Sequence, residues 1–184
     1  QSGNLFEAQP FATACEISRQ TVQNYIEALQ VTLMVTVLRP YSGASAAEIK
    51  SQPKVYAFDT GFVCYFRGID SLRDEDRGIL LEHLVLGELL ARRPRENVFY
   101  WRDKQKHEVD FVLKPDRGKE VLALECKCSP SHFNPAGLQS FRRRHPSGKN
   151  LVVCLDIVAP WEKAFREIDV EFIPFKLLPT RLEE

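Results

Sequence analysis

The chain has 184 residues, of which 44% are hydrophobic and 27% charged, and its 25 basic residues are balanced by 25 acidic ones. This length and apolar content are enough for one globular domain or two small ones, and they exclude a disordered tail. Because the formal net charge is zero, contact with nucleic acid would need a local basic patch rather than a positive field over the whole molecule.

The sequence favours a cytoplasmic protein without membrane contact. No apolar run reaches the roughly 18 residues that a membrane span needs, and the start, QSGNLFEAQPF, lacks the basic and apolar regions of a signal peptide. Five scattered cysteines favour reduced core residues over a disulfide framework. The Cys126-Lys127-Cys128 run is a weak zinc signal because no second pair of ligands accompanies it.

The first part of the chain has the pattern of two helices followed by two β-rich runs. A short helix is predicted near 8–15, and Ser18 is placed to cap a second helix. The apolar face of that second helix consists of Val22, Tyr25, Ile26 and Leu29. The β-rich runs LMVTVLRPY and KVYAFDTGF follow, joined through the loop SGASAAE.

This pattern has two interpretations, a helical hairpin packed on a sheet and a winged helix-turn-helix. In the second, the capped helix would present side chains suited to phosphates and base edges, namely Arg19, Gln20, Gln23 and Asn24. Winged helices also contact proteins, so a protein partner is an alternative to DNA.

The stretch DSLRDEDRGILLEHLVLGELLARRP predicts a charged lead-in and then an apolar helix that ends before Pro94. Glu82 interrupts its apolar face, either at the solvent edge or as part of a site. Beyond it, HEVDFVL and VLALECKC predict two strands joined by the turn KPDRGKE. The alternation of side chains puts Glu125 and Lys127 on one face, and a plausible register sets Asp110 near them.

An aspartate followed after about fifteen residues by E-x-K suits metal-dependent phosphodiester cleavage. Carboxylates bind Mg²⁺ or Mn²⁺ through oxygen, while a neighbouring ammonium orients the attacking water or stabilises developing charge. The alternative is a half-exposed row of salt-bridged side chains with a purely structural role. The spacing alone leaves both interpretations open.

Three stretches resemble the C-terminal module of a large family of bacterial and archaeal AAA+-type ATPases, a domain of unknown function similar to PD-(D/E)XK restriction-endonuclease-like folds. They are PKVYAFDTG at 53–61, the run W-R-x(5)-E-V-D-F-V from Trp101, and ALECKCS at 123–129. The resemblance implies Glu82, Asp110 and Glu125 as metal-binding carboxylates and, with Lys127, as catalytic residues. The family's phosphate loop, G-x-x-x-x-G-K-[ST], is absent here, so no ATPase activity is expected of this chain. The chain is expected to be either the C-terminal part of a longer ATPase or a homologue without the motor domain.

The densest basic cluster, FRRRHPSGKN, places Arg142, Arg143 and Arg144 at a helix end, where they either contact DNA phosphates or complement the helix dipole. The predicted fold is α/β, with a winged helix-turn-helix at 1–70 packed on a restriction-endonuclease-like mixed sheet, flanked by helices, at 71–184. The favoured function is DNA binding with Mg²⁺- or Mn²⁺-dependent nuclease chemistry. The alternative is a catalytically inactive interaction or regulatory module of such an ATPase.

Overall fold

The computed structural model describes residues 2–42, 52–114 and 120–183. These residues form six α-helices, a three-stranded sheet and a six-stranded mixed sheet, so the predicted α/β class is confirmed. Most of the predicted loop SGASAAE and of the predicted turn KPDRGKE lies outside the described residues.

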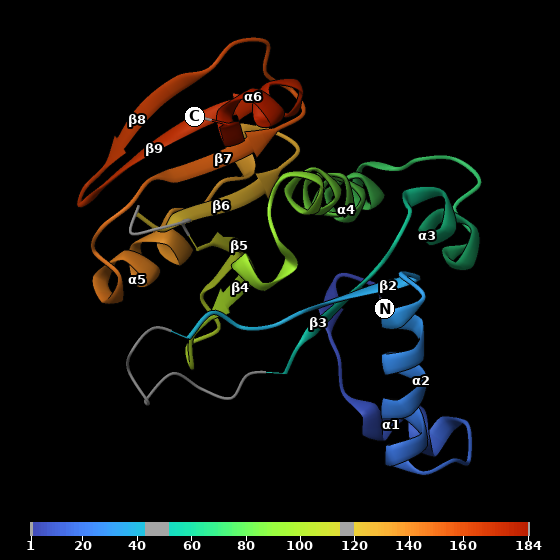
Figure 1. Ribbon diagram of the computed structural model, residues 1–184. Helices are drawn as coiled ribbons and strands as arrows, with labels where there is room; N and C mark the ends of the chain where they lie inside the picture. Colours follow the sequence, from blue (N-terminus) through green and yellow to red (C-terminus); the bar gives the residue numbers. More distant parts are fainter. Residues whose placement is uncertain (1, 43–51, 115–119, 184) are drawn as a thin grey trace.

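The small N-terminal sheet and its helices begin the fold (Figure 1). The helices are α1 (Ala8–Ala14) and α2 (Arg19–Val31), and the antiparallel strands, in spatial order, are β1 (Asn4–Leu5), β3 (Lys54–Ala57) and β2 (Val35–Leu38). The predicted cap is confirmed, because the Ser18 hydroxyl accepts the Thr21 N–H at 3.0 Å.

The predicted amphipathic helix forms as α2, but its apolar face is buried only at Val22, since Tyr25 and Leu29 are exposed. One expectation for this region was wrong. KVYAFDTGF is a strand only as far as Ala57, and the rest leads into helix α3 (Thr60–Arg67). The sequence held the signals of this helix, because Asp59 caps its first turn and Gly68 ends it in the left-handed conformation with φ 65°.

The six-stranded sheet forms the larger part of the molecule. Its spatial order is β4 (Val98–Arg102), β5 (Glu108–Leu113), β6 (Leu122–Lys127), β7 (Asn150–Cys154), β9 (Ile168–Pro174) and β8 (Trp161–Phe165). Neighbouring strands are antiparallel except in the pairs β6–β7 and β7–β9. The helices are α4 (Asp74–Arg92), α5 (Ala136–Arg144) and α6 (Leu178–Glu183). The sequence analysis predicted neither β8 nor α6.

Helices α4 and α5 cover opposite faces of this sheet. On the α4 face, Leu81 packs with Phe111 and Leu124, and on the α5 face Phe141 packs with Val152. Leu38 and Tyr56 of the N-terminal sheet belong to the first of these clusters. The two parts of the chain therefore share one core, and the division at residue 70 stays a prediction.

Arg142 ties the end of α5 to the sheet. Its Nε donates to the Asn150 side chain at 2.6 Å. Its two terminal nitrogens donate to the carbonyls of His145, Ser147, Val121 and Lys149. All five N–H donors of the guanidinium are thus used inside the fold. A Cβ at position 148 would lie 1.9 Å from the Val121 carbonyl oxygen, so Gly148, with φ 124°, is required beside this contact.

We expect Arg142→Lys to destabilise the chain, because an ammonium cannot replace five donors in a fixed fork and leaves buried carbonyl groups without partners. The expected loss in free energy of unfolding is on the order of 3 kcal/mol. Urea denaturation measures it. The matched control is Arg143→Lys, on the next, exposed position of the same helix, and an equal loss in both variants would contradict the role given to Arg142.

Candidate functional site

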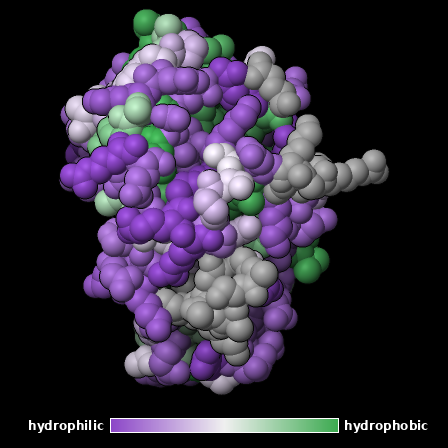
Figure 2. Space-filling view, turned by 90° about the vertical axis from the view of Figure 1, so that its left-hand side faces the viewer, coloured by the Kyte–Doolittle hydropathy of each residue, from purple (hydrophilic) through white to green (hydrophobic). Residues whose placement is uncertain are grey.

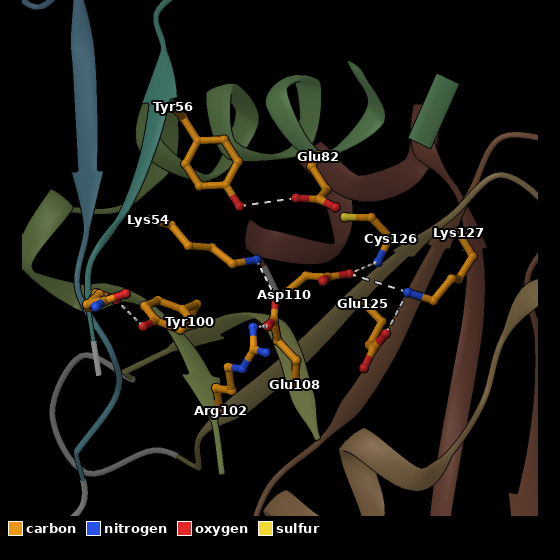
Figure 3. Close-up of polar contacts among 11 residues, drawn as sticks. Lys54, Tyr56, Glu82, Tyr100, Arg102, Glu108, Asp110, Glu125, Cys126 and Lys127 are labelled. Atoms are coloured by element: carbon orange, nitrogen blue, oxygen red, sulfur yellow. Dashed lines mark hydrogen bonds and ion pairs between the residues drawn. The ribbon is translucent and has the colours of Figure 1, made fainter. Parts of the chain in front are cut away.

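Strands β5 and β6 bring an aspartate, a glutamate and a lysine together where their pairing ends (Figure 3). The antiparallel register sets Phe111 opposite Leu124, which places Asp110 next to β6. The Cys126 N–H donates to Asp110 Oδ2 at 2.9 Å and fixes the carboxylate there. Local strand geometry therefore aims Asp110 at the E-x-K segment of β6.

The Lys127 ammonium joins the two carboxylates. Its Nζ lies 2.7 Å from Glu125 Oε2 and 3.5 Å from Asp110 Oδ2. Glu125 is 5% exposed and Asp110 8% exposed, so this cluster is held largely away from water. The structure thus brings together the three residues that the sequence placed on neighbouring strands, and their chemical roles remain predictions.

Glu82 approaches the same region from helix α4 (Figure 3). The Tyr56 hydroxyl of β3 donates to Glu82 Oε2 at 3.1 Å. Glu82 is half-buried and does not sit at the open solvent edge of its helix. Its described side-chain contact is with Tyr56 rather than with Lys127, and its role in a site remains a prediction.

The sequence analysis missed a second lysine at this centre, Lys54 of β3. It is 4% exposed, and its Nζ lies 2.5 Å from Glu108 Oε1, while Arg102 donates to the other oxygen of Glu108 at 2.9 Å. The available signal was a lysine that opens an apolar strand two residues before Tyr56, on the same strand face. Its partner lies 54 residues along the chain, so the pattern could not supply it.

Helix α5 closes the site from the other side. A Cβ at position 137 would lie 2.2 Å from the Glu108 carbonyl oxygen and 3.0 Å from Glu125 Oε1. Only glycine lets the first turn of α5 approach the strand so closely. Gly137 therefore helps to set the depth at which Glu125 is buried.

Burial and mutual repulsion perturb the carboxyl groups. Burial raises the pKa of Glu125 to about 8 and that of Glu82 to about 7. The negative charge of Asp110 is the second cause in both cases. Burial opposes the charge on Lys127, but Asp110 and Glu125 outweigh it and raise the pKa of its ammonium. Burial and the neighbouring charge therefore oppose ionisation of Glu125 and Glu82, and perturbed carboxyl groups of this kind are common at functional sites.

The donor set fits a hard divalent cation, with Asp110 and Glu125 as the residues that would hold it. Within the described ranges, no three His, Cys, Asp or Glu side chains gather in a way that would hold a metal ion by themselves. Mg²⁺, however, is commonly bound by one or two carboxylates together with water and substrate phosphates. Asp110 on β5 and Glu125 on β6 provide two such carboxylates.

The residues predicted to contact DNA divide into exposed and buried ones. Arg19, Gln20 and Asn24 are exposed on α2, and Gln23 is half-buried. Three of the four side chains are therefore open to solvent in the described fold, and Gln20 donates to Asn24 at 2.9 Å.

The arginine cluster of α5 needs a correction. Arg143 and Arg144 are exposed. The side of the molecule on which α5 lies is mostly hydrophilic (Figures 1 and 2). Arg142 is buried and uses all its donors on the fold, so it has none left for a phosphate.

These features describe an α/β module with a buried carboxylate and lysine centre that two sheets share. Residues 77–178 match the family described as "Domain of unknown function (DUF4143)", and since the match covers more than half of the chain, the chain belongs to this family. Residues 1–73 match a second family, "Domain of unknown function (DUF8612)".

Two curated relatives are uncharacterized proteins of Mycobacterium bovis and Mycobacterium tuberculosis. Each is 29% identical over 116 residues, which is 61% of this chain and 26% of the relative. The chain thus spans about a quarter of the length of the curated relatives it matches.

Among the residues that the structure describes, no helix is both long and apolar enough to cross a membrane.

The raised pKa of Glu82 predicts a pH-dependent stability. Its carboxyl is protonated in the folded chain up to about pH 7, whereas it ionises in the unfolded chain near pH 4.5. This group therefore contributes stability that is full below its unfolded pKa and is lost as the pH rises through 7. Glu82→Gln mimics the protonated form. We therefore expect its free energy of unfolding at pH 8 to exceed that of the wild type by on the order of 2 kcal/mol.

Urea denaturation at pH 5 and pH 8 measures this difference, which should shrink at the lower pH. Glu162→Gln, on the exposed strand β8, is the control. If the stabilities of Glu82→Gln and the wild type change in parallel with pH, Glu82 is not the group responsible.

Proposed function

We propose that this chain binds DNA and hydrolyses phosphodiester bonds with Mg²⁺ or Mn²⁺ at the centre formed by Asp110, Glu125 and Lys127. The observation that carries the proposal is the convergence of two buried carboxylates on one ammonium at the end of the β5–β6 pairing. A structural ion pair would need only one carboxylate. A second one adds repulsion that a divalent cation would relieve.

Each side chain has a distinct task in this proposal. Asp110 and Glu125 hold the ion, which when bound polarises the phosphate and lowers the pKa of a water molecule. Lys127, fixed between both carboxylates, orients the attacking water and offsets the charge that develops on the phosphate. Glu82, which accepts a hydrogen bond from the Tyr56 hydroxyl, places a third carboxyl group on the helix side of the centre.

The finer fold assignment belongs to the same proposal. Helices α1 and α2 with the hairpin strands β2 and β3 have the order of a winged helix-turn-helix, and α4, the mixed sheet and α5 have that of a restriction-endonuclease-like fold. DNA would contact the exposed polar row of α2 in the N-terminal part of the chain. In the larger part it would contact Arg143 and Arg144. We further propose that the chain works in the cytoplasm as part of an AAA+-type ATPase, whose motor domain would be its partner.

A second candidate function is a catalytically inactive module that contacts a protein and regulates such an ATPase. The observation that favours it is the position of Lys54 and Tyr56, which bring β3 of the N-terminal sheet against the acidic residues. Charges already paired within the chain can serve to join two parts of a fold without any chemistry.

Binding of a divalent ion distinguishes the hydrolytic function from the catalytically inactive interaction module. We expect isothermal titration with Mg²⁺ or Mn²⁺ to detect binding to the wild type and not to Asp110→Asn, because the amide removes a charged ligand. Lys127→Ala should keep the ion and lose nearly all cleavage of duplex DNA, because it removes the ammonium and no ligand. If the wild type binds no ion, or if Lys127→Ala cleaves as well as the wild type, the hydrolytic proposal fails.

DNA binding is expected to weaken as salt rises, and Arg19→Ala to reduce both the affinity and the salt dependence. The loss is on the order of 1–3 kcal/mol if Arg19 contacts a base, and a lost phosphate contact lowers the salt slope by about one. Fluorescence anisotropy with a labelled duplex at several salt concentrations measures both. Lys163→Ala on β8 is the matched control, and an unchanged affinity in Arg19→Ala would place the DNA surface elsewhere.

A further inference from the structure

Strand β3 inserts a positive charge into the acidic centre. Lys54 is almost fully buried, and it lies within the set of carboxylates shown in Figure 3 rather than at the rim of the molecule. Two further hydrogen bonds join this strand and the residues just before it to the larger part of the molecule. The Tyr56 hydroxyl donates to Glu82, and the Tyr100 hydroxyl of β4 donates to the carbonyl of Gln52, just before β3.

The ion pair with Glu108 does not by itself account for a buried lysine. Glu108 has a second cationic partner, Arg102, on its other oxygen, so one of the two cations exceeds what this carboxylate needs. Glu108 alternates onto the same side of β5 as Asp110, which brings Lys54 near that carboxylate. Burial opposes the charge on Lys54, but the negative charges of Glu108, Asp110 and Glu82 outweigh it and raise the pKa of the ammonium. Lys54 thus lies on the opposite side of Asp110 from Lys127 (Figure 3).

We propose that Lys54 is an internal competitor of the divalent ion, and that the N-terminal sheet lowers the ion affinity of the centre by holding this ammonium beside Asp110. The proposal rests on the proposed function, because it concerns the same carboxylates. Two like charges near one carboxylate oppose each other, and in a buried site the repulsion between an ammonium and a divalent cation is large. Any partner that displaces β3 would then raise the ion affinity.

The coupling has to act in both directions. If Lys54 weakens the binding of the ion, the bound ion must weaken the contact of Lys54 and β3 with the acidic centre by the same factor. Tyr56 and Leu38 remain packed in the shared core, so the expected effect is a local loosening of β3 rather than separation of the two sheets.

The test compares Mn²⁺ affinity by isothermal titration in the wild type, Lys54→Met and Lys54→Arg. We expect Lys54→Met to bind Mn²⁺ about tenfold more tightly or better, because it keeps the apolar length of the side chain and removes the charge. Lys54→Arg, which retains the charge, should resemble the wild type. Lys163→Met on the exposed strand β8 is the control for the loss of a lysine elsewhere.

Each result of the titration supports or overturns the proposed role of Lys54. Binding that is measurable in the wild type but equal or weaker in Lys54→Met overturns the role of Lys54 and leaves the proposed function standing. Binding that appears only in Lys54→Met supports the competition, while the hydrolytic proposal for the wild type fails. No binding in any variant overturns both proposals.

Hydrogen exchange on the wild type provides a second measurement if Lys54→Met does not fold. Saturating Mn²⁺ should speed exchange of the β3 backbone amides severalfold, whereas the amides of the distant strand β8 should not respond. Unchanged or slower exchange in β3 with the ion bound overturns the competition.

Discussion

The repulsion among buried carboxylates at the end of the β5–β6 pairing is the constraint around which this structure is arranged. Asp110 cannot turn away, because the Cys126 N–H holds its oxygen. Glu125 cannot withdraw, because α5 approaches it as closely as Gly137 allows. The negative charge therefore has to be balanced from outside β5, and the positive groups that do so come from β6, from β4 and from the N-terminal sheet.

This arrangement explains why the two parts of the chain, which match two different families, behave as one structural unit. The larger part supplies the acidic residues, and the smaller one supplies Lys54 and the Tyr56 hydroxyl. The apolar contacts of Leu38 and Tyr56 with the core of the larger part hold these polar groups in register. Losing the N-terminal part would thus change the electrostatics of a site whose carboxylates all lie in the other part.

The sequence predicted what depends on local periodicity and on one tight strand pairing. The alternation along β6 and its register with β5 were enough to place Asp110 beside Glu125 and Lys127, and Ser18 marked the start of α2. What could not be predicted depends on tertiary contacts. The burial of Arg142 arises from acceptors in two separate segments, at Val121 and at 145–150, and the pairing of Lys54 with Glu108 spans 54 residues. The exposed apolar face of α2 had the right periodicity, but periodicity does not state whether a partner surface exists.

Arg142 has one more consequence, which concerns how the sequence can vary. Its guanidinium binds carbonyl oxygens much as a protein-bound cation would, and it needs the Asn150 amide as its fifth acceptor and the bare backbone of Gly148 beside it. Replacing Arg142 leaves the Asn150 side chain without this donor, and replacing Asn150 leaves the Arg142 Nε without its acceptor. Positions 142 and 150 should therefore vary together among related sequences, whereas a side chain at 148 would meet the Val121 carbonyl whatever residue stands at 142.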